Sequence, residues 1–361
     1  MEEETNYLDR LPEWPEFAVV DGNIDGLVPV CKIGSWEYFL ELLKDERFRG
    51  SGHEYVFRGQ HHYRWFLEPT LGRSTNGVVS EDDAEAHLRK FKLSVRGRLP
   101  DSSIVYDAEE LWAIGQHHGL STPLLDWTQA PYVALFFAFI DDDSALWVDD
   151  YENIARAVFI LNKTYIEELG DVELKILEPS KDDHGRLVNQ AGLFTIAPYG
   201  ERLESALINS LSREGVDTDD PNVLARYLCK IYIPSGKKMR VDCLQQLHKM
   251  NIHHASLFPD IIGASNYCNA LSSGLYVGGG LDDSGSQEAV VEKGGGPDGH
   301  AEKAASKSIA IEPPHYEGGV VNVEDVFKIL RANAGPEIFN DHQLTSLAEQ
   351  IIVRYQKSAG L

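Results

Sequence analysis

The amino-acid sequence predicts an α+β fold, because it contains both strand-like and helix-like segments and enough apolar residues for a substantial core. Of its 361 residues, 43% are hydrophobic and 10% are aromatic, which suffices for one large domain or two. Runs of β-branched and aromatic residues predict strands at 54–59, 156–161, 189–196 and 227–233. Apolar periodicity and capping residues predict helices at 36–45, 81–97, 107–118, 129–140 and 237–250.

Start and stop residues divide the first third of the chain. Residues 1–34 show little periodicity, and we expect them to form a lead-in to the domain. Ser35 is the expected N-cap of the first helix. Asp107 opens a later helix, because Glu110 follows at capping-box spacing, and Gly119 suits that helix's end.

The segment that follows contains the most apolar helix of the prediction. Thr128 is its expected N-cap, and Pro131 fits its first turn. Apolar residues on every side predict that this helix is central and buried. Towards the end of the domain, Pro259 and Asp260 suit the first turn of one more helix.

The composition changes after residue 276. Residues 277–310 are rich in Gly, Ser, Ala, Glu and Lys, so we expect a flexible linker. Apolar periodicity returns within 311–361, which predicts a C-terminal helical appendage. The expected domain therefore covers residues 35–276.

Charge and cysteine usage exclude several classes of protein. The 33 basic and 57 acidic side chains give a net charge of −24, which repels nucleic acid and anionic membranes unless a local basic patch overrides it. We therefore expect neither membrane association nor non-specific nucleic-acid binding.

The longest apolar segment, 130–140, is too short to span a bilayer, and the N-terminus has no apolar signal core. The four cysteines have no CxxC spacing, which argues against structural zinc and disulfides. We expect a cytoplasmic protein.

Polar chemistry is concentrated in the run 112–128, between segments that are expected to be buried. This run holds two histidines, two hydroxyls, a carboxylate and an indole. A polar cluster between core elements is costly unless its groups are paired or used in function. Upstream, Arg58 follows a strongly apolar strand and offers a planar fork of donors for a phosphate or carboxylate. A salt bridge to a buried acid explains Arg58 equally well.

Structural explanations also exist for the other polar residues. Ser121 and Thr122 precede Pro123, and their hydroxyls could bind a ligand or satisfy the backbone of a turn. Asp126 lies just before the expected helix cap, where a carboxylate stabilises the helix N-terminus. On the residues alone, the structural explanation is favoured for all three.

Metal and hydrolase chemistry find little support. Histidine pairs stand at 61–62, 117–118 and 253–254, but adjacent side chains diverge by about 100° on a helix and point oppositely on a strand. There is no HExxH motif, no GxSxG elbow and no Walker A lysine. We expect no metal site, and a zinc hydrolase is a distant hypothesis.

Five segments resemble the FRG-domain family, in the family's order. They are 57–60, which contains the Phe-Arg-Gly motif that names the family, 67–73, 116–128, 186–195 and 256–260. The resemblance covers about residues 35–270. FRG domains in turn resemble the ADP-ribosyltransferase fold, a split antiparallel sheet with surrounding helices that holds NAD in a cleft.

This resemblance implies roles for individual residues. Arg58 matches the arginine of the first strand and would grip phosphate, with Gln60 beside it in the cofactor site. Ser121 and Thr122 match the hydroxyl-bearing strand and would position the ribose.

The remaining implied contacts surround the nicotinamide end of NAD. Gln190 would stand on the late strand and contact the ribose. His118 and Trp127 would line the nicotinamide pocket.

The expected glutamate of the late strand is missing. In the family's pattern it stabilises the positive charge that develops when the glycosidic bond breaks, but position 190 is Gln and position 192 is Gly. Losing one such contact costs on the order of 100-fold in rate. Asp126 is the favoured substitute, with Glu68 and Asp260 as the other candidate acids.

Two functional hypotheses follow. The first is an NAD-using enzyme that transfers ADP-ribose to a macromolecule or hydrolyses NAD, as in a bacterial or phage toxin or defence effector. The second is a non-catalytic module that binds a nucleotide or a partner protein, which the missing glutamate favours.

Overall fold

The computed structural model describes residues 6–49, 52–99, 101–142, 155–168, 174–179 and 185–276. The linker expected at 277–310 and the appendage expected at 311–361 lie outside these ranges. Within them, no helix combines the length and the apolar character that crossing a membrane requires.

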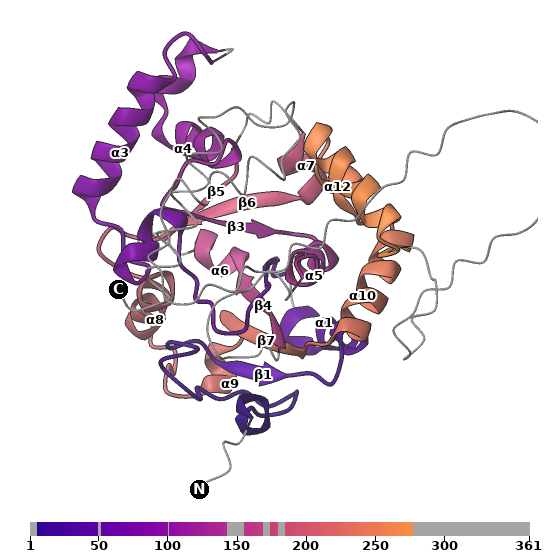
Figure 1. Cartoon of the computed structure of the whole chain (residues 1–361). Helices are drawn as coiled ribbons and strands as arrows, with labels where there is room; N and C mark the ends of the chain where they lie inside the picture. The colour runs from indigo at the N-terminus through magenta and orange to yellow at the C-terminus, as the bar shows by residue number, and fades with distance from the viewer. Residues whose placement is uncertain are drawn as a thin grey trace, which may run out of the picture. The chain divides into compact units, whose positions relative to one another are not determined.

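A seven-stranded sheet forms the centre of the described residues, in the spatial order β1-β7-β4-β2-β3-β6-β5 (Figure 1). The strands are β1 (Val30–Lys32), β2 (Tyr55–Gln60), β3 (Leu124–Thr128), β4 (Ala155–Asn162), β5 (Lys175–Leu177), β6 (Gly192–Ile196) and β7 (Leu228–Pro234). Neighbours pair antiparallel, except that β1 and β7 are parallel. The predicted α+β class is confirmed.

Helices cover both faces of this sheet. The α-helices are α1 (Phe39–Leu43), α2 (Glu46–Arg49), α3 (Glu81–Ser94), α4 (Ala108–His117), α5 (Pro131–Phe139), α6 (Lys163–Glu168), α7 (Arg186–Gln190), α8 (Leu203–Arg213), α9 (Pro221–Leu224), α10 (Lys237–Lys249), α11 (His254–Leu257) and α12 (Ile261–Ser272). Short 3₁₀ helices are η1 (Tyr7–Arg10), η2 (Trp36–Tyr38), η3 (Thr70–Thr75) and η4 (Ser102–Tyr106).

The alternation of strand side chains assigns these helices to the two faces. Phe57 and Ile160 point to the face covered by α1, α5 and α10. Their neighbours Val56 and Phe159 point to the opposite face, which α6, α8 and α9 cover. Both faces of the central strands are therefore buried.

The sheet consists of two ladders that meet at one point. β2 pairs with β4 along its whole length, and β3 pairs with β6 along its whole length. Between β2 and β3, however, the ladder has one residue pair, Phe57 with Thr128. A continued antiparallel register would place Arg58 opposite Trp127 and Gln60 opposite Leu125, but the strands have no further pairs. This divergence creates the space in which the site lies.

Two expectations about these elements are wrong. Residues 6–34 are no separate lead-in, because they supply strand β1 and bury Tyr7 and Leu11 in a cluster with Tyr232 of β7. Thr128 is the last residue of β3 rather than a helix cap, and α5 begins at Pro131. Pairing with β6 extends β3 to Thr128, a long-range effect that local capping preferences do not contain.

The predicted strand 189–196 is also divided. Residues up to Gln190 form helix α7, and Ala191 has a left-handed backbone with φ of 45°. That reversal separates the helix from β6, which begins at Gly192. Gln190 therefore does not stand on a strand.

Candidate functional site

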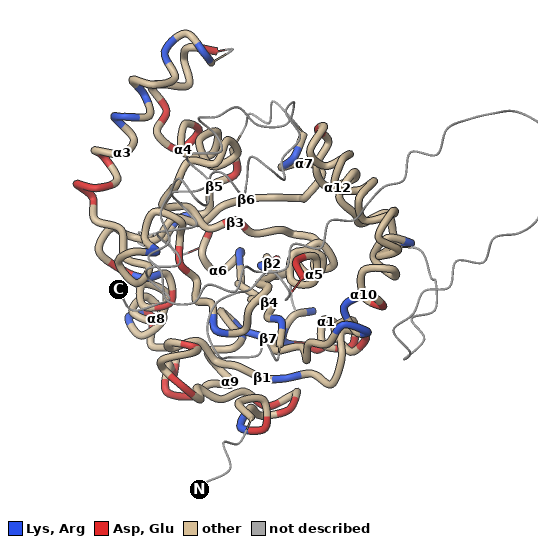
Figure 2. Tube along the Cα trace, in the orientation of Figure 1, with Lys and Arg blue, Asp and Glu red and all other residues tan. Residues whose placement is uncertain are grey.

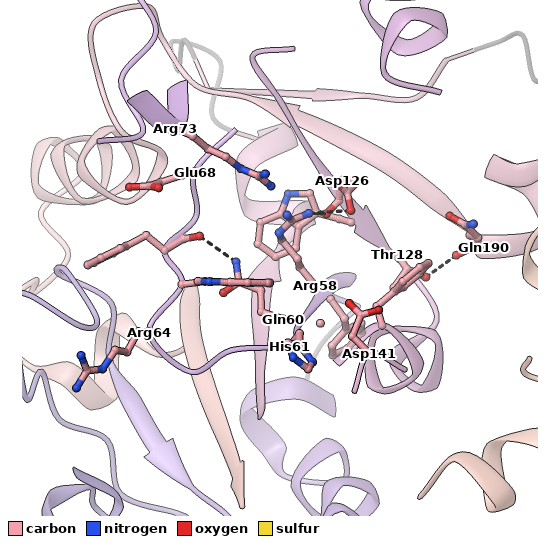
Figure 3. A pocket seen from close by; sticks show the side chains of 16 residues that line it. Arg58, Gln60, His61, Arg64, Glu68, Arg73, Asp126, Thr128, Asp141 and Gln190 are labelled. Atoms are coloured by element: carbon pink, nitrogen blue, oxygen red, sulfur yellow. Dashed lines mark hydrogen bonds and ion pairs between the residues drawn. The ribbon is translucent and has the colours of Figure 1, made fainter. Parts of the chain in front are cut away.

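A cavity of about 620 Å³ opens where β2 and β3 diverge. Residues 57–60 of β2 and 126–128 of β3 line two of its sides. The loop after β2, η3, α5 and the end of α7 complete the lining, through Phe66, Arg73, Phe137 and Gln190 among others (Figure 3). Its volume lies in the ordinary range of small-molecule and cofactor sites.

Arg58 bridges the gap between the two strands. Its Nη1 lies 2.8 Å from Oδ2 of Asp126 and donates to the backbone oxygen of Asp126, also at 2.8 Å. The guanidinium thereby uses a carbonyl on the edge of β3 that faces β2. Arg58 Nε is buried and has no hydrogen-bond partner among the described residues. The side chain is 14% exposed, so this donor faces a largely dry environment.

Asp126 presents a carboxylate to the cavity, with 64% of its side chain exposed. Desolvation in the cavity raises its pKa, but the Arg58 charge and hydrogen bond lower it by more, and Arg73 lowers it further. The net pKa is therefore below its usual value, and the carboxylate is ionised at neutral pH.

Arg73 brings a second guanidinium to the same place. It points towards Arg58 and Asp126, whereas Arg64 on the rim points away from them (Figure 3). Arg73 is exposed and makes no hydrogen bond or ion pair with any described residue. Around Asp126, two guanidinium groups thus face one carboxylate, which makes this part of the cavity locally positive. Glu68 and Asp141 also line the cavity.

Gln60 supplies an unsatisfied acceptor. Its side chain is 5% exposed, and its Nε2 donates to the backbone oxygen of Phe66 at 2.9 Å. That bond orients the amide, so Oε1 remains buried without a partner in the described part of the chain. A buried acceptor of this kind favours a ligand that carries an N–H or O–H group.

A second pocket of about 190 Å³, here called the second lobe, shares part of its lining with the cavity. The two lobes share Asp126, Trp127, Phe137 and Gln190 in their linings. Apolar side chains such as Ile114, Leu187 and Phe258 line the second lobe together with His118. Its character suits a flat, weakly polar ring.

Residues 53–145 of the chain match the family model of the FRG domain. The chain therefore contains an FRG domain. The match contains β2, β3 and α5 and therefore both strands that border the cavity, while Gln190 lies beyond it. Neither the curated proteins nor the solved structures include a significant match to this FRG-domain protein.

The FRG-domain structure brings most of the predicted site residues together. Arg58, Gln60, Asp126 and Gln190 line the main cavity, and His118 lines the adjoining lobe. Trp127 lies at the border of both lobes, but its indole is 3% exposed and donates from Nε1 to Thr195 Oγ1 at 2.9 Å. The indole is thus part of the core and offers no exposed face on which a nicotinamide ring could lie.

Ser121 and Thr122 are not among the residues that line either lobe. Thr122 is fully buried, its hydroxyl donates to Gln116 Oε1, and its backbone N–H binds Thr70 Oγ1 at 2.9 Å. Ser121 is exposed. The Thr122 hydroxyl therefore stabilises the turn before β3. Because neither hydroxyl lines the cavity, the structure gives no support to the implied role in positioning a ribose.

The candidate acids are also separated by the fold. Glu68 lines the main cavity, and its Oε1 lies 3.8 Å from Nη2 of Arg202. Asp260 lines neither lobe, because it caps α12 by accepting from Gly263 N–H at 2.8 Å and pairs with Arg186. Asp126 and Glu68 thus remain as candidate acids, and Asp260 is structural.

Sequence reasoning gave no role to Arg73 or Phe137. Arg73 is the last residue of the segment 67–73, which carries part of the family resemblance. The sequence does not show that its side chain points into the cavity. Phe137 lies in α5, and the sequence predicts that the apolar residues of this helix are buried in the core. In the described ranges, no three His, Cys, Asp or Glu side chains are arranged to hold a metal ion.

Proposed function

We propose that the cavity of this FRG domain binds NAD or a closely related nucleotide, and that the domain is an ADP-ribosyltransferase-like enzyme. The observation that carries the proposal is the polar lining of one cavity, which includes two buried atoms without a partner in the described part of the chain, Arg58 Nε and Gln60 Oε1, and the exposed guanidinium of Arg73. Buried polar atoms without partners cost free energy, so a site that keeps them is built for a ligand that pairs with them.

A phosphorylated nucleotide satisfies all three groups. Its diphosphate would accept from Arg58 and Arg73, since guanidinium donors match phosphate oxygens in geometry and charge. A ribose hydroxyl would donate to Gln60 Oε1. The two lobes, of about 620 and 190 Å³, offer separate space for the phosphates and for a nicotinamide ring.

Asp126 is the residue that we assign to the chemistry. Transfer of ADP-ribose breaks the bond between the ribose and nicotinamide, so that nicotinamide leaves with the bonding pair and an acceptor or water attacks the ribosyl cation. An ionised carboxylate beside that carbon would stabilise the cation. Asp126 lines both lobes, between the places given to phosphate and ring.

The arrangement of the strands supports the same proposal. The two antiparallel ladders that meet at Phe57 and Thr128 form a nearly split sheet, with the cavity at the split. The family resemblance implies a split sheet, and the single residue pair between β2 and β3 supports this part of the proposal. A role in a toxin or a defence effector is part of the proposal by family analogy alone.

The first test is a calorimetric titration of the full chain with NAD. We expect Arg58→Ala to weaken NAD binding by at least about tenfold, because a charge-assisted phosphate contact is lost. Its melting temperature should change little, because the Asp126 partner is mostly exposed and such pairs contribute about 1 kcal/mol or less. Arg10→Ala is the matched control, since it removes a surface ion pair with Asp21. Unchanged affinity with a large loss of stability would show that Arg58 is a structural residue.

The second test separates binding from catalysis by following nicotinamide release. Asp126→Asn should retain NAD binding while release falls on the order of 100-fold, the usual effect of losing one electrostatic contact in a transition state. If Asp126→Asn still releases nicotinamide and Glu68→Gln does not, Glu68 rather than Asp126 is the carboxylate that stabilises the ribosyl cation.

The non-catalytic module is the second candidate function. Two observations favour it: the Asp126 carboxylate is already paired with Arg58, and the hydroxyls of Ser121 and Thr122 lie outside the cavity. NAD binding without nicotinamide release, and without label transfer from NAD to proteins or nucleic acids of a cell extract, would establish this candidate.

A further inference from the structure

The C-terminal half of α3 and the turn that follows it carry a dense positive charge. Residues 89–98, here called the basic arm, contain Arg89, Lys90, Lys92, Arg96 and Arg98. They hold no acidic residue, although the whole chain has a net charge of −24. Figure 2 shows blue segments along this part of α3, while the red segments lie at its N-terminal end.

These charges are available to a partner. Arg89, Lys90, Arg96 and Arg98 are exposed, and Lys92 is half-buried. None of the five forms an ion pair or a side-chain hydrogen bond with the described residues. Basic side chains at such density repel one another. The nearest acidic residues in the sequence flank the arm, Glu85 one helical turn before Arg89 and Asp101 three residues after Arg98.

The apolar side of α3 packs against α4. The His87 ring stacks on Trp112 of α4, with ring centroids 6.1 Å apart, and Leu88 joins the same apolar cluster. Phe91 lies against Gly115, where an added Cβ would be 3.2 Å from its ring. The helix therefore turns its apolar side to α4 and its charges outward, which leaves no apolar face for insertion into a membrane.

We infer that the basic arm binds the phosphate backbone of a nucleic acid. A protein partner would need an apolar centre in the interface, whereas the arm offers one exposed apolar side chain, Leu93, at 52% exposure. A phosphate backbone instead presents closely spaced negative charge without apolar surface. The arm is thus the local basic patch that overrides the repulsion expected from the net charge.

Such binding has a characteristic dependence on salt. Each neutralised phosphate of a duplex contributes about −0.9 to the slope of log affinity against log salt, and about −0.7 for a single strand. Backbone contacts carry no sequence information, so we expect little sequence preference. The acidic surface elsewhere confines the contact to the arm.

The test measures binding of the full chain to labelled oligonucleotides by fluorescence anisotropy. Three probes, a single-stranded RNA, a single-stranded DNA and a DNA duplex, distinguish the nucleic-acid types at salt concentrations of about 50 to 200 mM. The variant Arg89→Gln/Arg96→Gln/Arg98→Gln removes three exposed charges of the arm. Its matched control, Lys237→Gln/Lys238→Gln/Lys249→Gln, removes three exposed charges of α10.

We expect wild-type chain to bind at least one probe with a Kd of about 10⁻⁴ to 10⁻⁶ M. The arm variant should bind that probe at least about tenfold more weakly at low salt, with a slope reduced by roughly 2 to 3. The α10 control should retain the wild-type affinity. Binding of NAD should be the same in all three proteins, because the arm lines neither lobe of the cavity.

Three results would overturn the inference. The wild-type chain could fail to bind every probe at low salt. The α10 control could lose as much affinity as the arm variant, which would indicate a diffuse charge effect. Polyglutamate could compete as well as the oligonucleotide at equal charge, which would identify an acidic protein segment as the better partner.

Discussion

The three residues of the Phe57-Arg58-Gly59 motif have three different environments, because successive side chains of a strand alternate and the strand ends there. Phe57 packs in the core beneath α5. Arg58 crosses to Asp126 at the cavity. Gly59 faces the backbone of α5, and a Cβ there would lie 1.8 Å from the carbonyl oxygen of Ala134. The motif therefore combines a core residue, a ligand-facing cation and a close contact between strand and helix.

Gly59→Ala should destabilise the domain severely at this contact. The added methyl group meets backbone atoms of α5, which cannot move aside without displacing the helix, so we expect a loss of about 3 kcal/mol or more in unfolding free energy. Gly22→Ala is the control, because a Cβ at that position has open space around it. Urea denaturation of both variants checks this, and a Gly59→Ala protein as stable as Gly22→Ala would contradict the packing described.

At the scale of elements, the end of α4 and the start of β3 form one hydrogen-bonded turn. The Thr122 hydroxyl donates to Gln116 Oε1 of α4, and it also accepts from Leu124 N–H at 3.3 Å. Its backbone oxygen accepts from Leu71 N–H in η3 at 3.0 Å. Gln116 in turn donates from Nε2 to Asp126 Oδ1 at 3.3 Å. The turn thus holds β3, and with it Asp126, in position beside the cavity.

Thr122→Val should lower stability without removing a ligand contact. The isosteric change deletes a buried hydroxyl and leaves its partners unsatisfied, which costs about 1–3 kcal/mol. Ser121→Ala, at the exposed neighbouring position, should be neutral within about 0.5 kcal/mol. Melting curves and NAD titrations of both variants are the measurement. A large loss of NAD affinity in Ser121→Ala would show that the Ser121 hydroxyl takes part in binding NAD.

At the scale of the whole described structure, a buried polar network joins segments that are distant in sequence. Lys230 Nζ lies 3.4 Å from Asp25 Oδ1 and donates to the backbone oxygen of Tyr63 at 2.6 Å. The hydroxyls of Tyr7 and Tyr232 donate to the same Asp25 carboxylate. The network ties the N-terminal residues to β7 and to the loop that carries His61, Arg64 and Phe66 at the cavity. This explains why residues 6–34 belong to the domain.

Lys230→Met should destabilise the domain by about 3 kcal/mol or more, because it leaves the buried Asp25 carboxylate without its counter-charge. The difference should also depend on pH. Burial lowers the pKa of Lys230 from 10.5 to about 8, although Asp25 opposes the shift. Above pH 8 the unfolded chain binds a proton at Lys230 that the folded chain does not, so this residue's contribution to stability rises with pH up to about 10.

Urea denaturation at pH 7 and pH 9.5 measures this dependence as the difference between wild type and Lys230→Met. The difference cancels the thiols and tyrosines that titrate in the same range in both proteins. A wild-type advantage that grows with pH is the expected result. An advantage that shrinks would mean that Lys230 stays charged in the folded state.

The sequence by itself determined the α+β class, the presence of an FRG domain and the bounds of the most regular elements. Strand 54–59, helix 81–97 and the helix opened by Asp107 are all present near their predicted bounds, because propensity, periodicity and caps act over a few neighbouring residues. The same local reasoning identified Arg58 as a candidate site residue, whereas the site roles of Gln60 and Asp126 came from the family resemblance.

Only the tertiary structure decided which of these residues share a cavity. The extent of β3, the helical position of Gln190 and the turn role of Thr122 depend on pairing with β6, on the reversal at Ala191 and on contacts with η3 and α4. Arg73 lies in η3, and its side chain points to the cavity between β2 and β3. These outcomes depend on contacts between residues far apart in sequence, and such contacts arise only when the whole domain packs.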